Sequence, residues 1–299
     1  MNRIDAAIEA YTTLLSPHDT DRLRFFKGLI EVQDRHAQLA VQAGGYTPPA
    51  ESEAQTWYRT EKPVFLMAPV PIDADRLTSS LEDVACYLID HAGFSSETAD
   101  ALRFFDWRGC IDSSDCKRAG SDPVAYIESI CESHGNDSDE AEVSPETLAL
   151  VLAYGLRPLL EPAALSIMSS LDLKQANENY NRPRTCPACG AHAAAATVGP
   201  TPSGASNGKM LYCALCGTTW EFERIRCANC GTQNQSKLHY FHVEGDEAHR
   251  LYCCDECGDY TRTVFQDSLA TPFAFEVEDI VMAKLDMIAH DKRFAGEEG

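Results

Sequence analysis

The sequence predicts an α+β fold, with a mostly helical N-terminal domain followed by two tandem metal-binding ribbons and a C-terminal helix. Apolar residues recur at helical spacing over the first part of the chain, eight of the thirteen cysteines form Cys-x-x-Cys pairs, and short β-type segments lie between the pairs. Because 299 residues exceed one typical domain, we expect a division at 1–180, 181–222, 223–270 and 271–299.

Two long helices are expected in the first part of the chain. Residues 20–44 have a helical pattern in which Thr20 can cap the start and Gly44 ends the helix. Residues 75–92 form the second expected helix. The apolar faces are expected at Leu23, Phe26, Ile30 and Ala37 in the first helix and at Leu77, Leu81, Val84 and Leu88 in the second.

Prolines and apolar spacing define two later helices. One opens at Ser144, with Pro145 at the first helical position, and Pro158 and Pro162 are expected to kink or divide it. The other covers residues 276–290 and should pack against the helical domain or the ribbons, through Val277, Val281, Leu285 and Ile288.

Four Cys-x-x-Cys pairs dominate the second part of the chain. They are Cys186/Cys189, Cys213/Cys216, Cys227/Cys230 and Cys254/Cys257, and the second two repeat the first two at an offset of 41 residues. Two intervening residues let both thiolates face one cation across a tight turn, so two pairs supply the four ligands of a tetrahedral site. The sequence therefore predicts two tetrathiolate metal sites.

The spacing between the pairs favours sequential grouping. Cys189 and Cys213 have 23 residues between them, as do Cys230 and Cys254, whereas ten residues separate the second pair from the third. A 23-residue insert is long enough for a hairpin, so the first two pairs should hold one ion and the last two the other. A cross-paired arrangement is the alternative.

Glycines and aromatic residues support this reading. Gly190, Gly217, Gly231 and Gly258 each follow the second cysteine of a pair, where a positive φ lets backbone N–H groups face a thiolate. Trp220 is expected to pack beneath a cluster. Strands are expected in segments rich in Thr, Tyr, Phe, Trp and Val, namely 209–212, 218–222, 238–243 and 260–265.

The ligand chemistry admits two metals and argues against catalysis. Four thiolates suit zinc or iron, and the expected cofactors are two such ions. A complete sulfur shell leaves no open position for substrate or water. The chain also lacks the GxGxxG, Walker, HExxH and GxSxG motifs, so we do not expect an enzyme.

The remaining cysteines and the histidines receive structural interpretations. Cys86 is expected in the helical core, Cys131 in a structural position, and Cys253 as a packing thiol beside the fourth pair, with an alternative role as ligand or redox thiol. Cys110 and Cys116 have no ligand spacing, with a redox pair as the alternative. The histidines are expected on the surface or in hairpins, as at His239, His242 and His249.

Net charge and cysteine content indicate the compartment and exclude some partners. The formal charge of −21 disfavours nucleic acids and anionic membranes, because both require clustered Lys and Arg. The N-terminal segment reads as an amphipathic helix rather than a signal peptide, and no run of 18 apolar residues occurs. A cytoplasmic location is expected, where thiols stay reduced and bind metal.

The motifs together resemble a known family. The segments CPACG, LYCALCGTTWEFERIRCANCG and CCDECGDY, after a helical first half, are similar to the formate dehydrogenase accessory protein FdhE family. The matching residues outside the four pairs are Trp220, Arg224, Arg226, Asp255 and Tyr260, whereas Cys253 stands where the family has a small residue. The resemblance is specific over 184–290 and weak over the first 180 residues.

The resemblance implies a cytoplasmic maturation factor that contacts the catalytic subunit of formate dehydrogenase. It also implies ribbons of the rubredoxin-like or zinc-ribbon type, so iron as well as zinc is a candidate metal. Two other classes are considered: a rubredoxin-type electron-transfer or redox-sensing protein, and a zinc-ribbon regulator that binds nucleic acid. Residues 181–260 contain seven Lys and Arg against eight Asp and Glu, which disfavours the regulator.

Overall fold

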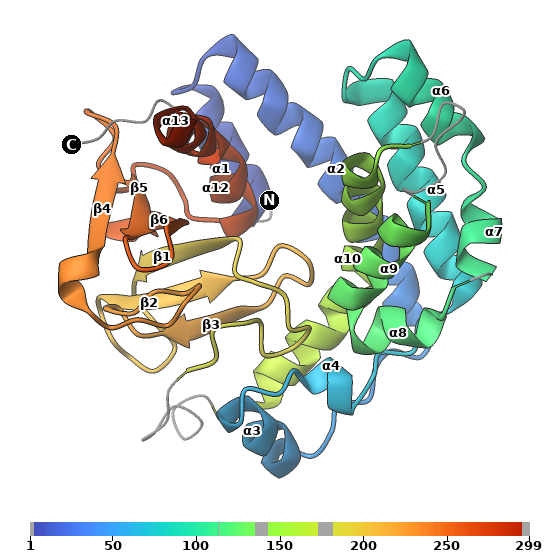
Figure 1. The fold of residues 1–299 in the computed structure, drawn as a ribbon, viewed down its shortest axis with the longest axis horizontal. Helices are drawn as coiled ribbons and strands as arrows, with labels where there is room; N and C mark the ends of the chain where they lie inside the picture. The colour runs from blue at the N-terminus through green and yellow to red at the C-terminus, as the bar shows by residue number, and fades with distance from the viewer. Residues whose placement is uncertain (1–2, 113, 135–142, 173–181, 295–299) are drawn as a thin grey trace.

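The computed structural model describes residues 3–112, 114–134, 143–172 and 182–294. A helical part lies beside a β-sheet, and the C-terminal helices return to lie between them (Figure 1). The α+β prediction is confirmed. The expected boundary at residue 180 falls outside the described residues, and the four-part division stays a prediction.

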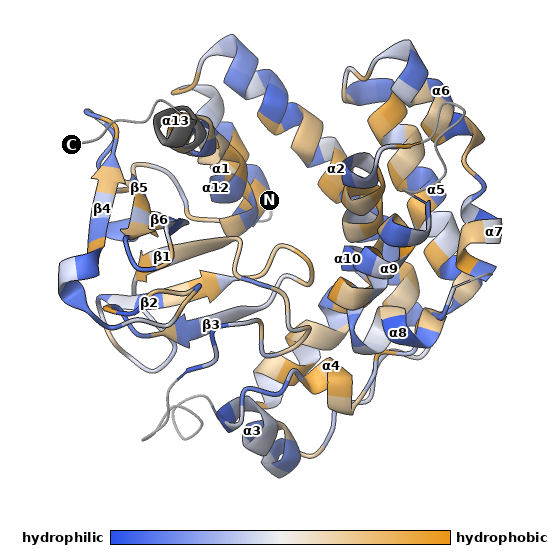
Figure 2. Cartoon of the chain, viewed as in Figure 1, coloured by the Kyte–Doolittle hydropathy of each residue, from blue (hydrophilic) through white to orange (hydrophobic). Residues whose placement is uncertain are grey.

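The helical part is built from α1 to α10. Their bounds are α1 Arg3–Thr12, α2 Pro17–Gln42, α3 Glu51–Arg59, α4 Val64–Met67, α5 Ala74–His91, α6 Ser96–Phe104, α7 Trp107–Asp112, α8 Cys116–Ser121, α9 Pro123–His134 and α10 Pro145–Ser170. Helix α10 packs against α2, α5 and α9 at the centre of this part. Figure 2 shows apolar residues along α10.

The ends of the long helices follow side-chain capping. Ser16, not Thr20, caps α2, because its hydroxyl accepts a hydrogen bond from the backbone N–H of Asp19 and Pro17 occupies the first turn. Thr20 is instead buried inside the helix. The prediction for α5 is confirmed, since the four predicted apolar residues are buried, and Ser144 caps α10 as expected.

Helix α10 continues through its prolines. Pro158 and Pro162 lie inside one 26-residue helix, so the predicted division does not occur. By length and composition this helix could cross a membrane, but 56% of its most apolar window is buried inside the protein. It also carries Arg157, which donates hydrogen bonds to Glu161 and to the hydroxyl of Tyr212 on the sheet. These contacts fit a core helix.

The sheet has six strands in the order β3-β2-β1-β6-β5-β4. The bounds are β1 Ala195–Gly199, β2 Gly208–Tyr212, β3 Thr219–Phe222, β4 Leu238–His242, β5 His249–Cys254 and β6 Asp259–Phe265, with short 3-10 turns at Gln235–Lys237 and Gln266–Ser268. Strands β1 to β3 form one antiparallel unit and β4 to β6 form the second. Strand β2 begins at Gly208 and β5 at His249, so the 41-residue repeat of the cysteines extends to the strands.

The two ribbons are one continuous sheet. Strands β1 and β6 pair in parallel, with Thr197 opposite Val264. The sequence predicts the ribbons as separate units and predicts no strand at β1, because Ala-Ala-Thr-Val-Gly lacks the aromatic residues of the other strands. Parallel pairing between segments far apart in the sequence has no local signal.

The C-terminal segment folds into two helices rather than one. Helix α12 covers Phe275–Val281 and α13 covers Ala283–Phe294. Val277 and Val281 pack with α1 and α2, whereas Phe275 and Leu285 pack on the sheet. The segment was predicted to pack against either the helical domain or the ribbons. In the structure it packs against both.

One core joins the helical part to the first ribbon. The cluster that contains Leu81, Leu152 and Leu160 of the helices also contains Trp220 and the first four paired cysteines. Burial of this shared apolar surface stabilises both parts together.

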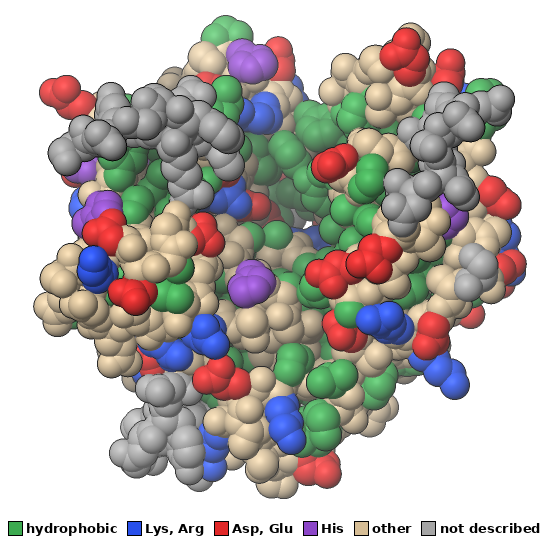
Figure 3. Space-filling model, viewed as in Figure 1, with side chains coloured by type: hydrophobic (Ala, Val, Ile, Leu, Met, Phe, Trp, Pro, Cys, Tyr) green, Lys and Arg blue, Asp and Glu red, His purple; other side chains and the backbone are tan. Residues whose placement is uncertain are grey.

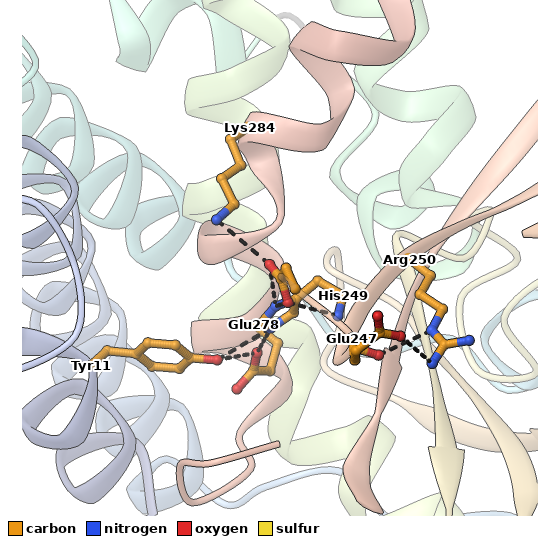
Figure 4. Close-up of polar contacts among 7 residues, drawn as sticks. Tyr11, Glu247, His249, Arg250, Glu278 and Lys284 are labelled. Atoms are coloured by element: carbon orange, nitrogen blue, oxygen red, sulfur yellow. Dashed lines mark hydrogen bonds and ion pairs between the residues drawn. The ribbon is translucent and has the colours of Figure 1, made fainter. Parts of the chain in front are cut away.

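A buried polar cluster joins α1, β5 and α12. His249 is 5% exposed. Its Nδ1 lies 2.8 Å from Asp246 and its Nε2 lies 2.8 Å from Glu278, whose carboxylate also accepts a hydrogen bond from the hydroxyl of Tyr11 (Figure 4). The expected surface position of His249 is wrong, because the return of α12 covers the end of β5.

The charge of His249 makes stability depend on pH. Burial lowers the pKa of His249, but hydrogen bonds and charge from Asp246 and Glu278 outweigh burial and raise it from 6.5 to about 9. A group whose pKa is raised on folding stabilises the folded protein fully below its unfolded pKa. This contribution, about 3 kcal/mol, is lost as the pH rises from 6.5 through 9.

The free energy of unfolding of the wild type should decrease as the pH rises from 6.5 to 9. We expect this decrease to be smaller in His249→Gln. The measurement is the free energy of unfolding in urea at several pH values. His239→Gln is the matched control, because the His239 side chain is 54% exposed. Equal pH profiles for the wild type and His249→Gln would contradict the assignment.

Candidate metal centre

The four Cys-x-x-Cys pairs form turns of the same design. The glycine after each pair has a positive φ, at 83° for Gly190, 72° for Gly217, 81° for Gly231 and 71° for Gly258. In each turn the glycine N–H donates to the carbonyl of the first cysteine, at 2.9 to 3.0 Å. The predicted left-handed glycines are confirmed, and each turn leaves its two thiols facing the same side.

The structure brings the eight thiols into two clusters. Site 1 consists of Cys186, Cys189, Cys213 and Cys216, and site 2 consists of Cys227, Cys230, Cys254 and Cys257. In each site the sulfur atoms lie within 4.8 Å of one another. This is the sequential grouping that the spacing favoured, and the cross-paired arrangement is not formed.

The sulfur separations fit a tetrahedral metal ion. Sγ–Sγ distances between the two turns of a site are 3.5 Å in site 1 and 3.7 to 3.8 Å in site 2. A tetrahedron with metal–sulfur bonds of about 2.3 Å has edges of about 3.8 Å, whereas a disulfide requires about 2.05 Å. The donor set therefore suits zinc or iron, with four thiolates for each ion.

Site 1 is enclosed by the helical part of the protein. Its four cysteines are at most 2% exposed. The backbone N–H groups of Val64 and Phe65 in α4 donate to the carbonyls of Pro187 and Ala188, inside the first turn. The hydroxyl of Thr218 lies 3.1 Å from Cys216 Sγ.

Trp220 of β3 belongs to the core that also contains site 1. It is fully buried in the same cluster as the four thiols, and its indole N–H donates to the carbonyl of Pro183 at 2.8 Å. This contact holds the ring against the segment that leads into the first turn.

Site 2 is open to solvent on one side. Cys227 and Cys254 are buried, whereas Cys230 and Cys257 are exposed. Burial raises the pKa of Cys227, but the backbone N–H groups of Cys230 and Asn229 point at its sulfur, and the pKa is lowered overall. The backbone of the turn therefore favours the thiolate form of Cys227.

The other cysteines lie outside both sites. Cys253 points to the opposite face of β5 from Cys254 and packs with the C-terminal helices, in agreement with a packing role. Cys110 is buried, and Cys116 and Cys131 are half-buried. Cys86 is exposed, so its predicted core position is wrong: Val84 and Ala85 take the inward positions of α5 instead.

The comparisons with known proteins agree with these motifs. Proteins named Protein FdhE from Escherichia coli O1:K1, from Escherichia coli O157:H7 and from Shigella boydii serotype 18 are each 33% identical to the chain over 112 residues. This match covers 35% of the chain and 35% of each relative, so it spans about a third of the length of these curated proteins. No family model matches the chain.

The likeness in structure extends much further than the likeness in sequence. The crystal structure of the FdhE protein from Pseudomonas aeruginosa covers 97% of this chain and 90% of its own, with a TM-score of 0.57 and 18% identity. The chain is therefore homologous to proteins named FdhE over 112 residues, and over nearly its whole length it has the fold of the Pseudomonas aeruginosa FdhE protein.

Proposed function

We propose that the chain is a non-catalytic accessory factor for formate dehydrogenase, which binds the catalytic subunit in the cytoplasm through a surface supported by two tetrathiolate metal sites. The observation that carries the proposal is the pair of closed four-sulfur clusters on one sheet, in the fold of FdhE. The homologues named FdhE and the family motifs around Trp220 and Arg226 support the identity of the partner.

The metal ions would hold the binding surface in shape. Each ion would close a turn pair that has too small a core to fold by itself, so metal binding contributes to folding. With four thiolate ligands, neither ion has a free position for substrate.

Site 2 lies at the part of this surface that a partner can reach. Cys230 and Cys257 are exposed there, and Ile225, in the link between the two sites, is 49% exposed. Figure 3 shows hydrophobic side chains interspersed with charged side chains of both signs on one face of the molecule. We therefore assign partner binding to the side of site 2.

Co-purification with the catalytic subunit tests the proposal. Replacing both Cys230 and Cys257 by Ser should abolish metal binding at site 2 and lower recovery of the subunit at least about tenfold, a loss of 1.4 kcal/mol or more in binding. Cys86→Ser is the control, because Cys86 is exposed and lies outside both sites. Unchanged recovery of the subunit and unchanged formate dehydrogenase activity in cells would refute the proposal.

The exposure of site 2 also favours a second candidate, electron transfer or redox sensing of the rubredoxin type. An iron–thiolate centre exchanges electrons efficiently only when its ligands approach the surface, as Cys230 and Cys257 do. Protein purified without oxygen should then show a visible absorption band that bleaches and returns on reduction and oxidation. Colourless protein with two zinc ions per chain would eliminate this candidate.

A further inference from the structure

A lysine is buried in the sheet, on a strand of the first ribbon. Lys209 lies on β2, opposite Phe222 of β3 and Val198 of β1, and is 1% exposed. Its Nζ lies 4.3 Å from the ring centre of Tyr252 and 5.4 Å from that of Phe222. The two rings come from different ribbons, so the ammonium group lies where the ribbons meet.

The ammonium group of Lys209 has no hydrogen-bond acceptor among the described residues. A buried ammonium loses its hydration, and contacts with aromatic faces recover only part of that loss. An unpaired charge in such a position indicates that a compensating negative charge is missing from the protein alone.

Two negative groups act on Lys209, and only one is available. Burial lowers the pKa of Lys209 to about 8, while the charges of Cys227 and Glu223 oppose this shift. Glu223 already accepts hydrogen bonds from Arg182 at 3.0 Å and from Arg226 at 3.1 Å. Geometry connects the ammonium group to site 2 from both ribbons. Tyr252 lies two residues before the ligand Cys254, on the same face of β5. The ring of Phe222 also contacts Arg226, which adjoins the ligand Cys227.

We propose that Lys209 is the counter-charge of site 2: its buried ammonium, held by Tyr252 and Phe222, balances the negative charge of the metal-loaded tetrathiolate. Four thiolates and one divalent ion carry a charge of about −2, which a cation stabilises from the buried side of the site, where Cys227 and Cys254 lie. The first ribbon thus provides a positioning residue for the metal of the second. The inference rests on the metal-binding part of the proposed function and is independent of the partner.

The repeat supplies a matched control. Arg250 lies 41 residues after Lys209, at the equivalent place on β5. Its guanidinium lies 4.1 Å from the ring centre of Phe265, but it also donates hydrogen bonds to Glu247 (Figure 4). Arg250 is therefore a cation over an aromatic ring that already has its own carboxylate.

Competition for zinc between the full-length protein and a chromophoric chelator tests the proposal. Lys209→Met keeps the size of the side chain and removes the charge, so affinity for zinc at site 2 should fall about 10- to 100-fold, as for other residues that support metal ligands. Lys209→Arg should retain most of the affinity, and Arg250→Met should leave both sites unchanged. A variant with Ser at Cys230 and Cys257 identifies which zinc ion belongs to site 2.

Thermal unfolding separates the proposed role from simple packing. In protein that retains zinc only in site 1, Lys209→Met should unfold at the wild-type temperature or higher, because it removes an unpaired buried charge. The rise in unfolding temperature when site 2 is filled should be smaller in Lys209→Met than in the wild type. Equal zinc affinity at site 2, or equal loss of stability with and without zinc there, would overturn the proposal, whereas absence of zinc from both sites would refute the metal-binding function itself.

Discussion

Replacing Cys186 and Cys189 by Ser is expected to lower the free energy of unfolding by at least about 4 kcal/mol, a large part of the 5–15 kcal/mol of a typical domain. Both thiols are at most 2% exposed and lie in the cluster that joins the helices to the first ribbon. The change places two serine hydroxyls in a buried site that offers them no hydrogen-bond partner, which costs about 1–3 kcal/mol for each hydroxyl. It also removes a metal ion whose binding stabilises the fold.

The measurement is urea unfolding followed by circular dichroism and by the fluorescence of tryptophan. Replacing Cys230 and Cys257 by Ser should cost clearly less, because both side chains are exposed and the solvent satisfies the new hydroxyls. Cys86→Ser should stay within about 0.5 kcal/mol of the wild type, as exposed substitutions usually do. Equal losses of stability at the two sites would show that burial does not distinguish them.

Metal is expected to leave site 2 at least about tenfold faster than site 1. This ratio corresponds to a difference of about 1.4 kcal/mol or more in the activation free energy of metal release. A chelator can reach the ligands Cys230 and Cys257 without any opening of the fold. Site 1 releases its ion only after the shared core opens, and such openings approach the free energy of global unfolding.

Release of the two ions into excess chromophoric chelator should therefore follow two phases of equal amplitude. The variant with Ser at Cys230 and Cys257 should lack the fast phase and keep the slow one. Mild urea should accelerate the slow phase and leave the fast phase nearly unchanged, because only the slow phase requires unfolding. A single phase of two ions would mean that the sites open together.

Local patterns of the sequence predicted the metal sites well. Two-residue spacing and the following glycine define each turn within five residues, so the turns need no distant contact. The grouping of the pairs also follows from chain length, because each ribbon closes over its own hairpin. Helical periodicity is also a local pattern, so the apolar face of α5 was predicted correctly at Leu77, Leu81, Val84 and Leu88.

Errors arose where a distant segment decides the environment. His249 looked like a hairpin residue, but α12 returns to bury it against Glu278, and Tyr11 of α1 completes the cluster across 267 positions of sequence. The sequence predicted no role for Lys209. A lysine inside an apolar strand nevertheless indicates that the side chain is either exposed at the edge of the sheet or has its charge balanced by a negative group. Cys86 was assigned to the core because helical periodicity does not separate the centre of an apolar face from its margin.

The sequence by itself determined the two four-cysteine clusters: eight cysteines in four glycine-terminated turns bring their sulfur atoms together wherever the ribbons lie. Only the tertiary structure decided that β1 and β6 join the ribbons into one sheet, that site 1 is buried against the helices while site 2 is open, and that Lys209 lies at the junction. The physical reason is range: a turn is set by dihedral angles of adjacent residues, whereas burial and charge pairing depend on which remote surfaces pack together.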